Sequence, residues 1–262
     1  MTDTDDITAA WARLAELTPA RIALGRTGIG LPTREVLGFA MAHARARDAV
    51  HTALDTDALA GELEGLGLDV ARVTSAVTSR EIYLRRPDLG RRLDEASAAA
   101  VDALTPKDAD LAIVVGDGLS ATAVHRNAVP VVNALATELR RQGRSLAPVV
   151  VATGARVAIG DDVGERLRAR AVLVLIGERP GLSAPDSLGA YLTFAPGRGR
   201  NDAERNCVSN IRDGGLGHAA AAFRLAWLTD AALTRGLTGV QLKDESETTL
   251  ARTGDAPPPL AD

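Results

Sequence analysis

The stretch AVLVLIGERPGL, residues 171–182, is an apolar run that ends abruptly in charge, proline and glycine. Residues 171–176 show no alternation of polar and apolar side chains, which is typical of a strand buried on both faces of a sheet. Glu178 and Arg179 follow directly. In an open parallel sheet, ligands bind at the carboxyl ends of the strands. The stretch therefore predicts a core strand whose tip offers two charges, either to a ligand or to each other.

Two similar apolar runs precede it, LAIVVG at 111–116 and APVVVATG at 147–154. The segments between the runs, 120–143 and 159–169, carry apolar residues at helical spacing, and we expect Pro130 to disturb or break the first helix. Strands that alternate with helices predict parallel pairing. The fold class that follows is α/β: a Rossmann-like, mostly parallel sheet with helices on both faces.

Further elements are predicted before and after these three strands. Residues 190–196 predict an edge strand, and 217–236 predict a helix that covers one face of the sheet. Residues 1–110 form a mostly helical N-terminal region; its expected elements are helices at 7–18, 33–54 (capped by Thr33) and 88–104 (capped by Asp88), with short strands in 70–84. We therefore divide the chain into this region, an α/β domain at 111–240 and a polar tail at 241–262.

Composition narrows the class of protein. Hydrophobic residues make up 46% of the 262 residues, which is enough for one sizeable core, and the net charge of -4 argues against a general nucleic-acid binder. Cys207 is the only cysteine, so an intrachain disulfide is excluded. The N-terminus lacks a signal-peptide pattern, and no run is long enough to span a membrane. We expect a cytoplasmic protein without membrane or nucleic-acid partners.

Three loops at the predicted strand ends, 116–121, 153–160 and 177–187, are candidates for a binding site because they are rich in glycine and polar residues. GDGLSA at 116–121 matches the dinucleotide fingerprint G-x-G-x-x-A. The strand that follows ends in VVVATGAR without the acidic residue that binds ribose, although Arg156 offers a cation for a phosphorylated cofactor. Three interpretations stay open: a tight turn with Ser120 capping a helix, a phosphate or cofactor contact, or a self-contained NAD(P)-binding oxidoreductase.

Motifs for other chemistries are missing from the sequence. It contains neither G-x-S-x-G nor a Walker lysine motif, and its histidines lack metal-ligand spacing. Asp161 and Asp162 are adjacent and point in different directions, so we expect a solvated helix start rather than a catalytic pair. We predict no catalytic residue and no metal ligand in this chain.

Five collinear stretches carry a more specific pattern: ARIALGRTGIGLPTREVLGFAMAHARARDAVH (20–51), REIYLRRPDLGRRL (80–93), VVGDGLSATAV (114–124), LVLIGERPGLSAPDSLGAYL (173–192) and ERNCVSNIRDGGL (204–216). Together they resemble the small subunit, or light chain, of ethanolamine ammonia-lyase from about residue 18 to 236. Motifs such as GERPGL and YLRRPDLGRRL are long enough to be specific.

The resemblance implies a carbon–nitrogen lyase that works as a hetero-oligomer. A large TIM-barrel subunit binds ethanolamine, and adenosylcobalamin is held between the two subunits. The complex converts ethanolamine to acetaldehyde and ammonia by a radical mechanism. The small subunit forms one face of the cobalamin site and is not expected to be active alone. Its N-terminal region is expected to contact the large subunit.

The resemblance also assigns residues. Val157, Glu178 and Cys207 match cobalamin contacts of the family, and Asp117 and Ser120 are further candidates at the neighbouring strand tip. Glu178 can accept hydrogen bonds from carboxamides or pair with a neighbouring arginine, and Cys207 can be a contact or a small buried residue. The sequence lacks D-x-H-x-x-G, the motif that displaces the lower base with histidine. The resemblance therefore implies base-on adenosylcobalamin.

Two further expectations concern surfaces and location. Arg85, Arg86, Arg91 and Arg92 are expected at a subunit interface or in intrachain ion pairs. Some family members carry a longer N-terminal extension associated with packaging in a protein shell. Because only a short stub precedes the match here, we expect a cytoplasmic enzyme and leave enclosure in a bacterial microcompartment open.

Overall fold

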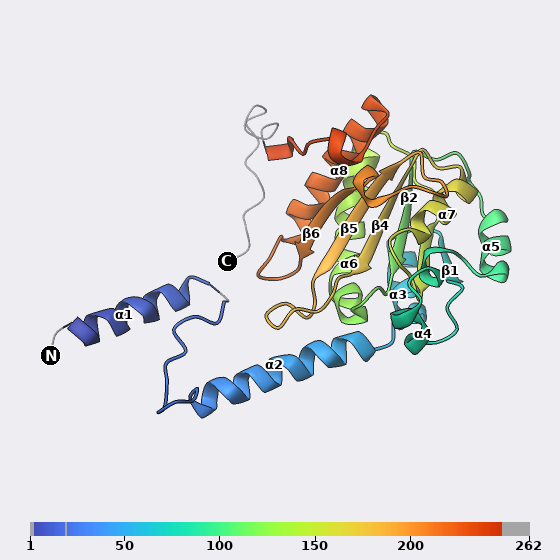
Figure 1. Cartoon of the computed structure of the whole chain (residues 1–262). Helices are drawn as coiled ribbons and strands as arrows, with labels where there is room; N and C mark the ends of the chain where they lie inside the picture. The colour runs from blue at the N-terminus through green and yellow to red at the C-terminus, as the bar shows by residue number, and fades with distance from the viewer. Residues whose placement is uncertain (1–2, 19, 248–262) are drawn as a thin grey trace.

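The apolar run at residues 171–177 forms β4 (Ala171–Gly177), an interior strand of a six-stranded sheet with the order β1-β3-β2-β4-β5-β6 (Figure 1). The computed structural model describes residues 3–18 and 20–247, and the side chains from residue 9 onward. All seven residues of β4 are buried. It pairs in parallel with β2 (Leu111–Gly116) and antiparallel with β5 (Leu188–Phe194), so it is covered on every side, as its unbroken apolar pattern predicts.

The sheet has a parallel and an antiparallel part. β1 (Val70–Thr74), β3 (Val149–Thr153), β2 and β4 are parallel, whereas β5 and β6 (Asn206–Ile211) run antiparallel to their neighbours. The predicted α/β class with a mostly parallel sheet is confirmed. β1 precedes residue 111, so the sheet takes one strand from the N-terminal region.

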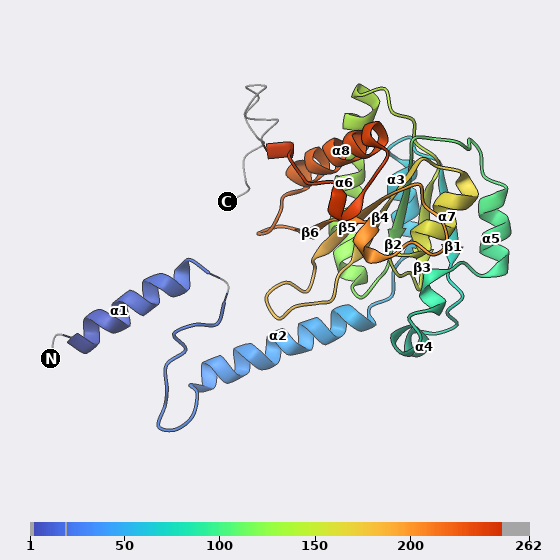
Figure 2. The ribbon, with the colours of Figure 1, turned by 45° about the horizontal axis from the view of Figure 1, so that its top comes forward.

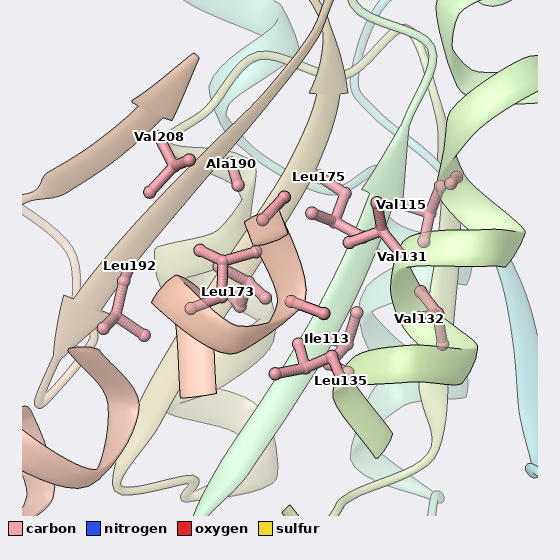
Figure 3. Close-up of a cluster of buried hydrophobic side chains, with 14 of the residues drawn as sticks. Ile113, Val115, Val131, Val132, Leu135, Leu173, Leu175, Ala190, Leu192 and Val208 are labelled. Atoms are coloured by element: carbon pink, nitrogen blue, oxygen red, sulfur yellow. The ribbon is translucent and has the colours of Figure 1, made fainter. Parts of the chain in front are cut away.

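Helices cover both faces of the sheet, as predicted. On one face lie α3 (Thr56–Glu64), α6 (Ala121–Arg141) and α8 (His218–Arg235). On the other lie α5 (Glu95–Asp102) and α7 (Ile159–Leu167). Figure 3 shows the first face, where Val131 and Leu135 of α6 meet Ile113 and Leu173 of the sheet. The core is almost wholly aliphatic, in keeping with a chain that is 3% aromatic.

The N-terminal helices α1 (Asp3–Glu16) and α2 (Thr33–His51) extend away from the layered body (Figures 1 and 2). Only Ala49 of α2 is buried. Many large apolar side chains of this arm, defined here as residues 9–41, are exposed: Trp11, Leu14, Leu17, Ile29, Leu31, Val36, Leu37, Phe39 and Met41. None of the described helices, in the arm or elsewhere, is both long and apolar enough to cross a membrane.

The predicted edge strand is wrong in its position. β5 lies between β4 and β6, and β6 is the edge. Most side chains of β6 face solvent, and its sequence, NCVSNI, contains few apolar residues. The apolar pattern therefore did not predict this strand. α6 also continues through Pro130, which is exposed, so the proline does not end the helix.

Two predicted caps are also wrong. The helix expected at 88–104 is a short 3₁₀ turn, η1 (Leu89–Arg91), followed by α5, whose cap is Asp94; its carboxylate accepts from the Ser97 amide at 2.7 Å. Thr33 is already the first residue of α2 and provides no cap hydrogen bond.

Three short elements complete the described chain: α4 (Arg80–Arg85), η2 (Asp202–Glu204) and η3 (Gly239–Gln241). The expected polar tail falls mostly on residues 248–262, outside the described residues. Its first part packs on the body, because Leu242 is buried and Asp244 pairs with Arg224 of α8.

Candidate functional site

The carboxyl ends of β2, β3 and β4 meet at an open pocket of about 420 Å³. The register aligns these ends, because Gly116 of β2 pairs with Ala152 of β3 and Ile176 of β4. Val157, from the loop after β3, and Glu178, from the tip of β4, both line the pocket. Two residues that the resemblance predicts as ligand contacts are therefore brought together from the loops that follow two successive strands, β3 and β4.

The glycines of GDGLSA serve close packing of the loop. Gly118 has a φ of +56°, and a Cβ there would lie 2.3 Å from the Gly177 carbonyl oxygen. The Leu119 amide donates to that same carbonyl at 2.9 Å. The loop after β2 is thus pressed against the end of β4, and only glycine allows this approach.

Asp117 holds two loops together. Its carboxylate accepts from the amides of Gly118 (2.9 Å), Gly154 (3.0 Å) and Ala155 (2.8 Å). Arg80 Nη1 lies 3.6 Å away. Burial raises the pKa of Asp117, and the three amide bonds and Arg80 oppose that rise. Its oxygens are thus turned to the chain's own backbone.

Ser120 is the N-cap of α6 and is fully buried. Its hydroxyl accepts from the Ala123 amide at 3.2 Å and donates to the Pro185 carbonyl at 2.8 Å. Asn127 donates to the Asp186 carbonyl at 2.9 Å, which fixes the same segment on the helix. The loop between β4 and β5 therefore covers the start of α6, where a dinucleotide would place its pyrophosphate.

Glu178 keeps its carboxylate at the pocket through neutral partners. Ser187 Oγ donates to Glu178 Oε2, and the Asn210 amide lies 3.4 Å from the same oxygen. Gly189 leaves room for this arrangement, because a Cβ there would lie 2.9 Å from Glu178 Oε1. Among the described residues Glu178 forms no ion pair, and Arg179 is exposed. The alternative of a local ion pair at the tip of β4 is not what the structure contains.

Cys207 is exposed on β6, so the interpretation as a small buried residue is wrong. Its thiol lies 3.2 Å from Ser209 Oγ. Tyr191 of β5, its partner in the sheet register, lines the pocket, so Cys207 borders the pocket without lining it. Burial raises the pKa of Tyr191, and the neighbouring Cys207 adds to the rise.

A stacked trio of Tyr83, Arg80 and Arg156, which the sequence did not predict, lies at this pocket: Tyr83 and Arg156 line it, and Arg80 lines the neighbouring pocket. Tyr83 of α4 is buried. The guanidinium carbon of Arg80 lies 4.6 Å from the centroid of its ring, and that of Arg156 lies 4.1 Å from the same centroid. The Tyr83 hydroxyl donates to the Ala155 carbonyl at 2.9 Å, and burial raises its pKa to about 12. Tyr83 lies within the YLRRPDLGRRL motif, the one signal that could have drawn attention to it.

The expectation of a solvated Asp161–Asp162 pair is wrong, because both side chains are buried. Asp161 pairs with Arg205, and Asp162 accepts from Arg166, Arg198 and the Leu93 amide. These pairs brace the start of α7 behind the Val157 loop. Of the surface arginines, Arg85 pairs with Glu81 and Arg86 with Asp88.

Comparison with known proteins agrees with the family pattern. The family model "Ethanolamine ammonia-lyase light chain (EutC)" matches residues 8–243. An ethanolamine ammonia-lyase small subunit from Bradyrhizobium diazoefficiens is 57% identical over 234 residues, covering 89% of this chain and 90% of that protein. One from Ralstonia nicotianae is 51% identical over 263 residues, covering 97% of both. One from Xanthomonas campestris pv. campestris is 54% identical over 250 residues, covering 94% and 92%. The chain therefore belongs to the ethanolamine ammonia-lyase small-subunit family.

Proposed function

We propose that this chain is the small subunit of an adenosylcobalamin-dependent ethanolamine ammonia-lyase and that its pocket forms one face of the cobalamin site. The observation that carries the proposal is the convergence of Val157 and Glu178 on a single pocket at the carboxyl ends of β2, β3 and β4. This edge is where open α/β sheets bind ligands.

The residues present fit the chemistry of a corrinoid. A corrinoid offers an apolar macrocycle surrounded by carboxamides. Val157 and Ile176 supply apolar surface, and Glu178 supplies acceptor oxygens that no cation of the described chain neutralises. Enclosing sites for drug-sized ligands measure roughly 300–1,000 Å³. An open pocket of about 420 Å³ suits one wall of a site for a larger ligand, with the other wall supplied by a partner.

The bound cofactor would supply an adenosyl radical by homolysis of its cobalt–carbon bond. Val157 would pack against the ring, and Glu178 would accept hydrogen bonds from carboxamide groups. Cys207 lies at the margin of the site. Asp117 and Ser120 act as positioning residues, because their polar atoms hold the loops rather than face the pocket. This chain would contribute no residue to the reaction itself and no ligand to cobalt.

The arm extends the proposal to the partner. A large subunit with a TIM barrel would bind ethanolamine and cover the exposed apolar side chains of residues 9–41. The C-terminal end of α2 supports this placement, because His51 lines a second pocket that shares Tyr83 with the first. A partner that closes the cobalamin site would thus also contact the end of α2, and its interface would continue along that helix to the arm. We place the complex in the cytoplasm, free or within a bacterial microcompartment.

The alternative of a self-contained NAD(P)-dependent oxidoreductase has less support. The start of α6 is capped by Ser120 and covered by the 185–187 segment, which leaves little access for a pyrophosphate. The glycines of GDGLSA are explained by packing against β4.

Reconstitution separates the two functions. The chain, its large subunit and adenosylcobalamin together should release acetaldehyde and ammonia from ethanolamine, and the chain alone should not. Titration of the chain with NAD and NADP should leave its melting temperature unchanged, since a ligand that binds the folded state raises it. Deamination by the isolated chain, or stabilisation by either nucleotide, would contradict the proposal.

A further inference from the structure

Arg156 differs from the other arginines that are partly or fully buried. Most of these pair with a carboxylate: Arg80, Arg144, Arg166, Arg200, Arg205 and Arg224. Arg212 has no such pair, but it donates to Asn210 Oδ1 and the Asp213 carbonyl. The Arg156 guanidinium donates only to the Tyr83 carbonyl, at 3.2 Å, and no carboxylate of the described residues forms an ion pair with it. A half-buried guanidinium is costly unless its charge and its donors are satisfied.

The guanidinium is also held in a fixed position. It stacks at 4.1 Å on the ring of Tyr83, and its stem runs against Gly90, where an added Cβ would lie 2.8 Å from Arg156 Cγ. The Arg156 amide donates to the Gly90 carbonyl at 2.8 Å. Packing therefore restricts the side chain before any ligand arrives, which is how binding residues are preorganised.

Arg156 and Glu178 both line this pocket. Arg156 follows β3 and Glu178 follows β4, and within the described part of the chain the two side chains form no ion pair with each other. The lining of the pocket thus includes both a fork of donors and an acceptor. A ligand that carries both acceptor oxygens and N–H groups matches this polarity.

We propose that Arg156 is a ligand contact of this pocket and donates to an acceptor oxygen of the bound corrinoid. The inference rests on the proposed function and deepens it. Two sources on a cobalamin have this chemistry: the carbonyl oxygens of its carboxamides and the phosphodiester oxygens of its nucleotide loop. Arginine suits both, because its planar fork presents paired donors to a carbonyl or phosphate.

The test compares two ligands on the complex with the large subunit. Hydroxocobalamin has the nucleotide loop, and cobinamide lacks it; equilibrium binding is followed by corrin absorbance, without any activity measurement. The variants are Arg156→Gln and Arg156→Lys, and Arg170→Gln is the control. Arg170 immediately precedes β4, so it lies at the amino end of the strand, opposite to the pocket, and it pairs with Asp110.

Arg156→Gln is expected to bind hydroxocobalamin about tenfold more weakly than the control, and Arg156→Lys is expected to fall between them because it keeps the charge but loses the fork. A loss confined to hydroxocobalamin identifies the phosphodiester as the acceptor, and a loss with both ligands identifies a carboxamide. If Arg156→Gln does not fold, Arg156→Lys decides by the same comparison. Affinities equal to the control for both ligands overturn the inference. A wild-type complex that binds neither ligand contradicts the proposed function instead.

Discussion

Arg205 and Asp161 form a buried ion pair that joins the start of β6 to the start of α7. Arg205 Nη1 lies 2.8 Å from Asp161 Oδ1, and Nη2 lies 2.6 Å from Oδ2. The two side chains are 2% and 4% exposed. Thr193 Oγ1 accepts from the same guanidinium at 2.8 Å. The pair therefore fixes the strand that carries Cys207 relative to the helix that follows Val157.

Removal of one partner should be strongly destabilising. Asp161→Asn is expected to lower the free energy of unfolding by about 3 kcal/mol, because it leaves a buried guanidinium without its buried charge partner. Urea denaturation of the chain measures this. Asp202→Asn is the matched control, since Asp202 lies 3.5 Å from the same arginine but is 96% exposed. Asp202→Asn should lower the free energy of unfolding by less than about 1 kcal/mol. Equal losses for the two variants would show that burial of the pair contributes nothing.

The packing of the GDGLSA loop can be tested with a pair of glycines. Gly118 and Gly143 both have positive φ, at +56° and +69°, but only at Gly118 would a Cβ meet other atoms closely. Gly143→Ala should cost about 1–2 kcal/mol, from the left-handed conformation alone. Gly118→Ala should cost about 2 kcal/mol more, because the Gly177 carbonyl must move. Melting temperatures compare the two. Similar losses would contradict the close approach.

The two tyrosines predict a stability change at alkaline pH. Burial raises the pKa of Tyr83 to about 12, and burial also raises that of Tyr191. An unfolded tyrosine titrates near pH ~10. The folded state therefore holds these protons more tightly, so the stability they contribute is full below pH ~10 and is lost as the pH rises toward about 12.

Tyrosinate absorbance measures this directly, because Tyr83 and Tyr191 are the only tyrosines in the sequence. The folded chain should begin to titrate well above the pH at which the urea-unfolded chain does. Tyr83→Phe should reduce the loss of stability between these two values. If the folded and unfolded chains titrate together, the burial of the two rings is contradicted.

The arm predicts a defect in assembly rather than in folding. Leu37 is 63% exposed, so Leu37→Asp should leave the melting temperature of the isolated chain nearly unchanged. It should weaken association with the large subunit by about tenfold or more, because a charge would be buried in the interface. Val240→Asp is the control, since Val240 is 78% exposed and lies outside the arm. Sedimentation of the mixed subunits compares them. Equal association would place the interface elsewhere.

The fold followed from local patterns wherever the environment of a segment was uniform. Residues in β2, β3 and β4 are buried on both faces, and their unbroken apolar runs predicted them. β6 escaped because an edge strand that faces solvent carries little apolar signal. The burial of Asp161 escaped because its partner, Arg205, lies 44 residues away in the sequence.

The candidate site was predicted only in part, for the same reason. Glu178 and Val157 came from the family pattern and from the rule that strand ends bind ligands, and both line the pocket. Tyr83 and the stacking of Arg156 depend on contacts across 73 residues, which periodicity cannot express. Asp117 and Ser120 were predicted as further cofactor contacts, and that role stays a prediction; their polar atoms bond to the backbone of neighbouring loops, an orientation that tertiary packing sets.

The proposed cobalamin site depends most directly on Glu178, which the tip of β4 would present to the cofactor. The measurement is the equilibrium affinity of the two-subunit complex for cobalamin, with Glu178→Gln compared to Glu165→Gln, an exposed carboxylate on α7. Loss of a charged acceptor should weaken binding by about tenfold or more, whereas the control should bind like the wild type. If the Glu178→Gln complex binds cobalamin as tightly as the Glu165→Gln complex, the carboxylate at the tip of β4 does not contact the cofactor, and the proposed cobalamin site is contradicted.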